Sequence, residues 1–326
     1  MQRPLMRLFA GVLAALCAAV LAACGDEDSP DAATGRATTV KVGVVPIVDV
    51  APLFLGVEKG FFRDEDLTIR TQFAEGGAAI VPAVMSGDLQ IGFSNTTSLV
   101  IARSKGLPMR IIANGAGAGT NADDAPDAVM VRGDSKIRDA GDLEGRTVAV
   151  NTLNNVATLT LNSALERSGA DYRKVKVTEV PFPDMAAAIE AGRVDAAMVQ
   201  EPFVTAMKEA GSRVIFNPME QTERNYTFAT YFASERFIQA QPGVLERFVR
   251  ALERSLDYAQ QHPDEARRAV LGYTKTPADA AKAMTLARWE RELDTSSIEL
   301  TARLAERYGY VERAPAIDTL VWAGRG

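Results

Sequence analysis

The side chains that could contact a small solute gather in short polar turns, each of which follows a predicted β-strand. These turns are residues 46–49, 76–77, 94–97, 151–155, 183–184 and 200–203. Hydroxyl and amide side chains, together with the N–H groups at helix starts, can replace the water shell of a solute with fixed hydrogen bonds. Each turn alone is also typical of an ordinary helix N-cap. The prediction of a binding site therefore depends on the convergence of several such turns, because ligands bind at the carboxyl ends of strands in open α/β sheets.

Other kinds of chemistry find little support in the sequence. The chain has one histidine, His262, and two cysteines, which excludes a multi-histidine metal site, a four-thiolate zinc site and an iron–sulfur cluster. It lacks a G-x-S-x-G nucleophile elbow and a P-loop, and the glycines of 115–119 have the wrong spacing for a dinucleotide fingerprint. His262 lies far from the polar turns and is expected to be a solvated turn residue. We therefore expect no catalytic residue, no metal and no cofactor.

The charge of the turns leaves the ligand class open. They contain no lysine or arginine but include the carboxylates Asp49 and Glu201. An anion would be held by neutral donors there, whereas a neutral or amine-bearing ligand would suit the two carboxylates better. This carboxylate pair could in principle perform acid–base catalysis, although helix capping or ligand orientation is the simpler interpretation. The formal charge of −6 argues against nucleic acid as a partner, because phosphate binding needs clustered basic residues.

Alternating strands and helices must position these turns. Strands are predicted at 40–46, 67–73, 90–94, 109–113, 128–132, 147–151, 174–180 and 196–200. Helices are predicted between them at 51–59, 78–86, 97–105, 155–168, 184–191 and 202–210, with Asp49 as a candidate N-cap of the first. Pro82 requires that the second helix begin near Val81 or kink. This alternation predicts an α/β fold with parallel sheets and right-handed crossovers. The Gly- and Ala-rich segment 114–126 is expected to be a linker between two halves.

The last third of the chain has a helical pattern. Helices are expected at 244–260, 263–271, 277–293 and 297–308. In the first of them one apolar face is formed by Leu245, Phe248, Val249, Leu252 and Leu256. This helical extension must bury its apolar faces against the α/β halves.

The N-terminal segment has the marks of an export signal. Arg3 and Arg7 precede an apolar stretch that is too short to span a bilayer, and the stretch ends in Leu21-Ala22-Ala23-Cys24. This box resembles the lipobox of bacterial lipoproteins, which implies cleavage after residue 23 and lipidation of Cys24. A plain secretory signal or an N-terminal membrane anchor is the alternative. Residues 24–37 have the composition of a flexible tether. Cleavage would leave 303 residues with 34 basic and 42 acidic side chains and a formal charge of −8.

Several motifs together resemble one known family. They are Val-Gly-Val-Val-Pro at 42–46, the block Glu58-Lys59-Gly60-Phe61-Phe62, Gly76-Gly77, Gly87-Asp-Leu-Gln-Ile-Gly92, Asp142-Leu-Glu-Gly145 and Gln200-Glu201-Pro202-Phe203. In this order they resemble the nitrate/sulfonate/taurine and thiamine-precursor solute-binding proteins of ABC transporters. The resemblance covers residues 38–325. It implies a periplasmic-binding-protein type II fold, with residues 38–127 plus 226–326 as lobe 1, residues 128–225 as lobe 2 and a ligand cleft between them.

The same resemblance implies the site and the partners. The family's ligand contacts come from the polar turns, so the candidate ligand-binding residues are Asp49, Gly77, Asn95, Thr96, Asn154 and Glu201. The expected function is capture of a sulfonate, nitrate, aromatic acid or pyrimidine by a monomeric lipoprotein on the extracytoplasmic face of the cell membrane. The partners are then an ABC permease and its ATPase. The alternatives are an enzyme that resembles the pyrimidine-precursor synthases of the same fold, and a ligand-sensing subunit without transport.

Overall fold

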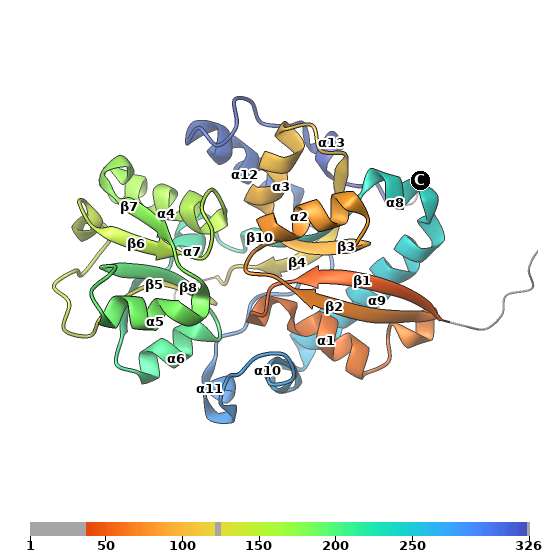
Figure 1. Ribbon diagram of the computed structural model, residues 1–326, viewed down its shortest axis with the longest axis horizontal. Coiled ribbons are helices and arrows are strands. Elements are labelled where there is room, and N and C mark those ends of the chain that lie inside the picture. The colour runs from red at the N-terminus through yellow and green to blue at the C-terminus, as the bar shows by residue number, and fades with distance from the viewer. Residues whose placement is uncertain (1–36, 121–124, 325–326) are drawn as a thin grey trace, which may run out of the picture. The chain divides into compact units, whose positions relative to one another are not determined.

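The computed structural model describes residues 37–120 and 125–324 (Figure 1). The predicted signal segment, the tether up to Arg36 and the predicted lipidation site Cys24 lie outside the described residues. Among the residues that are described, no helix combines the length and the apolar character needed to cross a membrane.

The first sheet has five strands in the order β2-β1-β3-β10-β4. Its strands are β1 (Thr38–Val44), β2 (Leu67–Phe73), β3 (Ile91–Asn95), β4 (Met109–Gly117) and β10 (Thr227–Ser234). The helices between its first four strands are α1 (Ala51–Glu58), α2 (Gly77–Ser86) and α3 (Thr96–Ser104). β10 enters this sheet more than one hundred residues after β4, so the chain leaves the first sheet and later returns to it.

The second sheet also has five strands, in the order β7-β6-β8-β5-β9. They are β5 (Asp127–Val131), β6 (Thr147–Val150), β7 (Lys176–Glu179), β8 (Ala196–Gln200) and β9 (Arg213–Phe216). The helices of this part are α4 (Val156–Arg167), α5 (Phe182–Glu190), α6 (Phe203–Glu209) and α7 (Pro218–Thr222). Figure 1 shows the two sheets as separate groups of strands, each with its own helices.

Both sheets are mixed, so the prediction of parallel sheets is wrong. β1 runs parallel to β2 and β3, but β10 is antiparallel to β3 and β4. In the second sheet β6 is parallel to β7 and β8, whereas β5 is antiparallel to β8 and β9. The reason is topological. β5 and β10 are the first strands after the chain has crossed from one sheet to the other. Each therefore begins at the edge of its sheet where the parallel strands end, and it runs in the opposite direction to them.

The local sequence explains how the helices begin and end. α2 ends at Gly87, whose φ of 91° is left-handed and therefore suits glycine. The same helix begins at Gly77, so Pro82 lies inside it rather than in its first turn. Asp49 is not the N-cap of α1, because it lies in a short 3₁₀ helix (Val48–Val50) and the helix begins after Val50 without a side-chain cap.

Helices form the C-terminal third. They are α8 (Glu235–Ala240), α9 (Pro242–Gln261), α10 (Pro263–Val270), α11 (Ala278–Ala283), α12 (Thr295–Arg307) and α13 (Ile317–Leu320). Among them α8, α9, α12 and α13 pack on strands of the first sheet, whereas α11 contacts α10 and α6. The predicted apolar face of α9 is confirmed, because all five of its residues are buried. His262 joins α9 to α10, where its half-buried ring stacks on Tyr258 at a centroid distance of 3.9 Å.

The predicted helix over residues 277–293 is wrong beyond Ala283. From Met284 onward the backbone makes its hydrogen bonds with other segments instead. Arg288 and Gly117 exchange two backbone hydrogen bonds, and the side chain of Asn114 donates to the carbonyl of Glu290 at 2.9 Å. These partners satisfy the backbone groups that a helix would otherwise pair internally.

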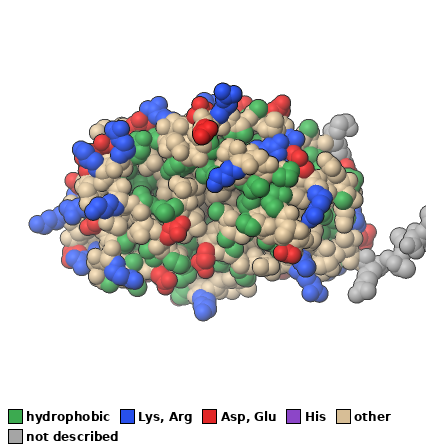
Figure 2. Space-filling view, turned by 45° about the horizontal axis from the view of Figure 1, so that its top comes forward, with side chains coloured by type: hydrophobic (Ala, Val, Ile, Leu, Met, Phe, Trp, Pro, Cys, Tyr) green, Lys and Arg blue, Asp and Glu red, His purple; other side chains and the backbone are tan. Residues whose placement is uncertain are grey.

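Basic and acidic side chains are interspersed on the face shown in Figure 2 rather than gathered by sign. This face differs from the basic stripe of a nucleic-acid-binding face.

Candidate functional site

A cavity lies where the ends of strands from both sheets meet. It contains about 470 Å³ of space that no atom fills, part of it open to solvent. The first sheet contributes the ends of β1 and β3 and the start of β10, and the second contributes the ends of β6 and β8. The lining residues are Val45, Ile47, Asp49, Gly76, Gly77, Phe93, Ser94, Asn95, Asn151, Asn155, Val156, Ala157, Phe182, Met198, Gln200, Met219, Phe228 and Ala229. The cavity therefore has apolar and aromatic walls with a few polar groups between them, as small-molecule sites do.

Polar side chains connect the two sides across the cavity. Asn95 caps α3 by accepting a hydrogen bond from Ser98 N at 2.9 Å, and the same oxygen accepts one from Val156 N of α4 at 3.3 Å. Asn151 Nδ2 donates to the carbonyl of Glu75 at 3.2 Å. The amide oxygens and N–H groups of this region thus hold the second-sheet side against the first-sheet side.

Asn155 organises the start of α4. Its side chain accepts from Thr158 N, and the hydroxyl of Thr158 accepts from Asn155 N, which forms a capping box. Its amide nitrogen donates to Asn151 Oδ1 at 2.8 Å and to Thr152 Oγ1 at 2.9 Å. This network fixes the turn that presents α4 to the cavity.

Asp49 is the one carboxylate of the lining. Its side chain is 1% exposed, and its Oδ1 atom has no hydrogen-bond partner within the described residues. Its Oδ2 atom accepts from Gln200 Nε2 at 3.5 Å, which is a long contact. Burial raises the pKa of Asp49 to about 7, because the charged form loses its hydration. The residue is therefore a buried acceptor whose charge changes near neutral pH.

Three of the six predicted site residues lie together. Asp49, Gly77 and Asn95 all line the cavity. A Cβ atom at Gly77 would lie 2.0 Å from Ser94 Oγ, so the close approach of α2 to β3 requires glycine here.

The other three predicted residues, Thr96, Asn154 and Glu201, do not line the cavity. The hydroxyl of Thr96 donates to the carbonyl of Phe228 at 3.2 Å in a buried position. Asn154 is exposed and takes the left-handed conformation, with φ of 51°, that the turn before α4 requires. The Glu201 carboxylate accepts from Thr205 N, Thr205 Oγ1 and Thr285 N at 2.8–3.1 Å, which is a structural role.

Several lining residues were not among the sequence candidates. Asn151, Asn155 and Gln200 lie within the same polar turns as the residues chosen, and the N-cap spacing of Asn155 and Thr158 was a usable signal. Phe228 and Ala229 were missed because β10 was not predicted. Its run of threonine and aromatic residues is typical of a buried strand.

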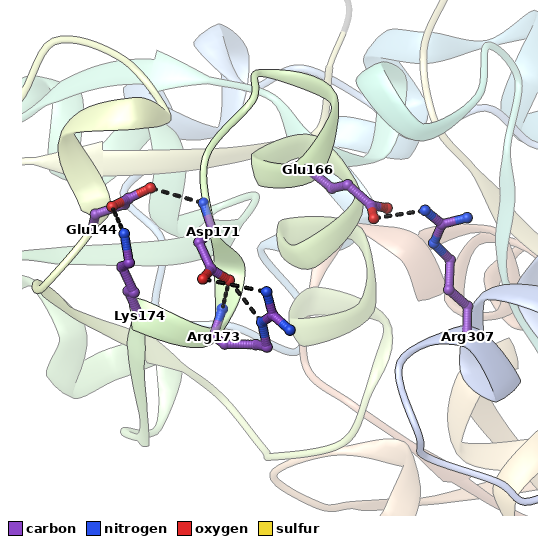
Figure 3. A network of polar contacts seen from close by, with 6 residues as sticks. All are labelled: Glu144, Glu166, Asp171, Arg173, Lys174 and Arg307. Carbon is purple, nitrogen blue, oxygen red and sulfur yellow. Dashed lines mark hydrogen bonds and ion pairs between the residues drawn. The ribbon is translucent and has the colours of Figure 1, made fainter.

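A further contact between the two sides lies away from the cavity. Glu166 near the end of α4 forms an ion pair with Arg307 of α12 at 2.6 Å (Figure 3). Its other carboxylate oxygen accepts from Tyr308 Oη at 3.0 Å. These bonds lower the pKa of Glu166. Figure 3 also shows the pair of Glu144 with Lys174, at 2.8 Å, which joins two segments of the second-sheet side.

Two mixed five-stranded sheets with a cavity at their junction define the periplasmic-binding-protein fold. The ligand-binding component of an ABC-type import system from Staphylococcus aureus has this fold at a TM-score of 0.76 and 14% identity, covering 87% of this chain and 96% of its own. The alkanesulfonate-binding protein SsuA from Xanthomonas axonopodis pv. citri, bound to MOPS, is similar at a TM-score of 0.72 and 17% identity, covering 88% of this chain and 99% of its own.

Sequence comparison then gives the family. The chain belongs to the NMT1/THI5-like family, whose model matches residues 47–266. The formylaminopyrimidine-binding protein of Halalkalibacterium halodurans is 24% identical over 264 residues, which are 80% of this chain and 78% of that protein. A 4-amino-5-hydroxymethyl-2-methylpyrimidine phosphate synthase of Candida albicans is 23% identical over 225 residues, which are 66% of this chain and 65% of that protein. The family resemblance inferred from the motifs is confirmed.

Proposed function

We propose that the protein captures one small organic solute in the cavity between its two sheets and delivers it to an ABC importer. The observation that carries this proposal is the cavity itself, which has apolar walls, a few polar groups and contributions from both sheets. The family and the binding-protein relatives support the same function. The alternative function of ligand sensing without transport uses the same cavity and differs only in the partner.

The two sheets are proposed to belong to two lobes that close on the solute. Lobe 1 comprises residues 38–127 plus 226–326, and lobe 2 comprises residues 128–225. Hydrogen bonds such as that from Val156 N to Asn95 Oδ1 cross between them at the cavity, so closure and solute binding would use the same groups. The permease is expected to recognise the closed arrangement of a monomer.

The protein is proposed to act outside the cytoplasm, held to the membrane by a lipid on Cys24. The signal-like segment and the box that ends at Cys24 support this location. A Cys24→Ser variant is expected to lose the anchor, because no thiol remains for the lipid. Cell fractionation checks this: the wild type should partition with membranes and the variant should be released. Membrane association that survives the substitution would contradict the lipid anchor.

We propose a binding function rather than catalysis. The lining of the cavity offers no histidine, lysine or cysteine among the described residues, and the one carboxylate, Asp49, lacks a partner for acid–base work. The similarity to a pyrimidine phosphate synthase keeps an enzyme as the second candidate. Turnover of an aminopyrimidine precursor by the purified protein would favour that candidate over the binding function.

A thermal-shift screen tests the proposed function. Sulfonates, nitrate, aromatic acids, pyrimidines, amines and amino acids are added to the purified protein, and the unfolding temperature is measured. A ligand stabilises the native state by about 2.7 kcal/mol at a hundredfold excess over its dissociation constant. A clear upward shift with at least one solute is expected, followed by one-to-one binding in calorimetry. If no solute class shifts the unfolding temperature, the proposed function fails.

A further inference from the structure

The polarity of the cavity carries a more specific inference, which rests on the proposed function. Asp49 is buried and lines the cavity, and its Oδ1 atom has no partner among the described residues. A buried acceptor without a hydrogen bond raises the free energy of the folded protein. A ligand that brings a donor to Asp49 removes this penalty and gains binding free energy from doing so.

No basic side chain opposes Asp49 in the cavity. The lining contains no lysine, arginine or histidine. A purely anionic solute would therefore enter a cavity whose one titratable side chain is a carboxyl group. A solute with an ammonium, amidinium or amino group would instead form a charge-assisted hydrogen bond with it.

Most other polar groups of the lining are already in use. Asn155 donates to Asn151 and Thr152, and Asn151 in turn donates to the backbone of Glu75. The oxygen of Asn95 accepts two N–H groups. These side chains shape the cavity, and they leave few donors for a ligand.

The start of α2 is different. This ten-residue helix begins at Gly77 in the cavity wall and has no side-chain cap. The first N–H groups of a helix have no partner inside the helix, and the positive end of the helix dipole favours a negative or acceptor group. The N–H of Ala79 already donates to the carbonyl of Gly76 at 3.0 Å, so the donors that α2 can offer a ligand are the N–H groups of Gly77 and Ala78. The cavity thus combines an acceptor at Asp49 with these donors at the start of α2.

We propose that the cavity selects a small bipolar solute. Its nitrogen-bearing end donates hydrogen bonds to Asp49, and its carboxylate, sulfonate or carbonyl end accepts them from the N–H groups at the start of α2. Asp49 is then the residue that rejects simple sulfonates, nitrate and carboxylates.

The protonation of Asp49 supplies an independent signature. The titratable groups that face it are Tyr231 of β10, Tyr273 after α10 and Asp127 of β5. Burial raises the pKa of each of these three groups. The pKa of Asp49 itself is about 7 in the absence of a ligand. Pairing with a cationic group requires the ionised carboxylate, so binding below pH 7 should release a proton and affinity should rise with pH.

Two matched ligand series test the proposal by calorimetry. One contains para-(aminomethyl)benzoate, para-toluate and para-methylbenzylamine, and the other contains homotaurine, propanesulfonate and propylamine. In at least one series the bipolar member is expected to bind at least about tenfold more tightly than either one-ended member. Its affinity should rise between about pH 5 and about pH 8, with proton release measured in buffers of different ionisation enthalpy.

Isosteric variants show whether Asp49 is the residue that causes the preference for the bipolar ligand and the proton release. Asp49→Asn should weaken the bipolar ligand by roughly ten- to hundredfold and abolish the proton release. Asp184→Asn is the matched control, because Asp184 is exposed and lies outside the lining, and it should change neither. Proton release by the wild type is measured independently of how well the variant folds.

Three outcomes would overturn the inference. They are a one-ended acid or sulfonate that binds as tightly as its bipolar partner, affinity that falls as pH rises, and the absence of binding by all six compounds. If the broad screen nevertheless finds a solute, such as a simple anion, the proposed function stands and only this inference fails. If the broad screen finds none, the proposed function itself fails.

Discussion

The two ends of α4 meet the first-sheet side of the molecule in different ways. At its start, Val156 N donates to Asn95 Oδ1 inside the cavity, where both groups are neutral. At its end, Glu166 pairs with Arg307 at the surface, where the two side chains are 39% and 60% exposed. We call these the inner contact and the outer contact.

The difference separates a contact that responds to the ligand from one that responds to the solvent. The inner contact is buried and lines the cavity, so a bound solute can compete with it or complete it. The outer contact lies in solvent, so salt screens it and its contribution to stability is small. We infer that the inner contact controls affinity and that the outer contact adjusts it weakly.

The largest effect on stability is expected from the carboxyl group of Asp49, which lines the cavity beside the inner contact. An acid whose pKa is raised by folding destabilises the protein as pH rises, because the unfolded state releases its proton first. The contribution of Asp49 is therefore intact below about pH 4 and is lost as pH rises to its folded-state pKa of about 7. The full loss is up to about 4 kcal/mol.

Asp49→Asn should remove this pH dependence. The stability of the ligand-free variant relative to the wild type should rise by up to about 4 kcal/mol between about pH 4 and about pH 8. Denaturant unfolding of both proteins over this range measures the difference. Glu201, whose pKa burial also raises, is unchanged in the variant and cancels in the comparison. The charge of Asp49 contributes to the raised pKa of Asp127, so the pKa of Asp127 should fall in the variant and add to the measured difference. Parallel stability curves for the two proteins would contradict the ionisation of Asp49.

An intermediate effect is expected for Asn95→Ala. The variant loses the cap on Ser98 N and the inner contact, which should cost roughly 1–2 kcal/mol of stability and about tenfold in ligand affinity. Ser234→Ala is the matched control, since its hydroxyl caps α8 by accepting from Phe237 N away from the cavity. It should lose similar stability but no affinity. Equal affinity in wild type and Asn95→Ala would remove the inner contact from the site.

The smallest effect is expected for Glu166→Gln at the outer contact. Exposed ion pairs contribute about 0.2–1 kcal/mol, so affinity should fall no more than about fivefold and the effect should vanish at high salt. Glu144→Gln is the control, because its pair with Lys174 joins segments of the second-sheet side alone. A salt-independent loss, or the same loss of affinity in the control, would contradict a specific role for the outer contact.

The sequence predicted those elements whose boundaries depend on nearby residues. The predicted bounds of β2 and β8 agree with the structure, and Gly87 ends α2 as predicted. β10 was missed because all eight of its residues are buried between strands from far earlier in the chain, so no alternation marks it. Its antiparallel direction also depends on where the chain re-enters the sheet, which a local pattern does not contain.

The candidate site shows the same limit at the scale of single residues. Asn95 could be placed at the cavity because it ends a strand and caps the next helix. Gln200 and Glu201 are neighbours, yet Gln200 lines the cavity while Glu201 bonds to Thr205 and Thr285. Asn154 and Asn155 differ in the same way because Asn154 takes the left-handed turn. Which neighbour faces the cavity depends on the turn conformation, and the residue types alone do not determine it.

A crystal structure of the protein with the tightest ligand from the screen would show directly whether the cavity is the binding site. We expect one solute in the cavity between the ends of β1, β3 and β8, within hydrogen-bond distance of Asp49 and in contact with the side chain of Asn95. A solute bound at any other place, with the cavity left unoccupied, would contradict this expectation.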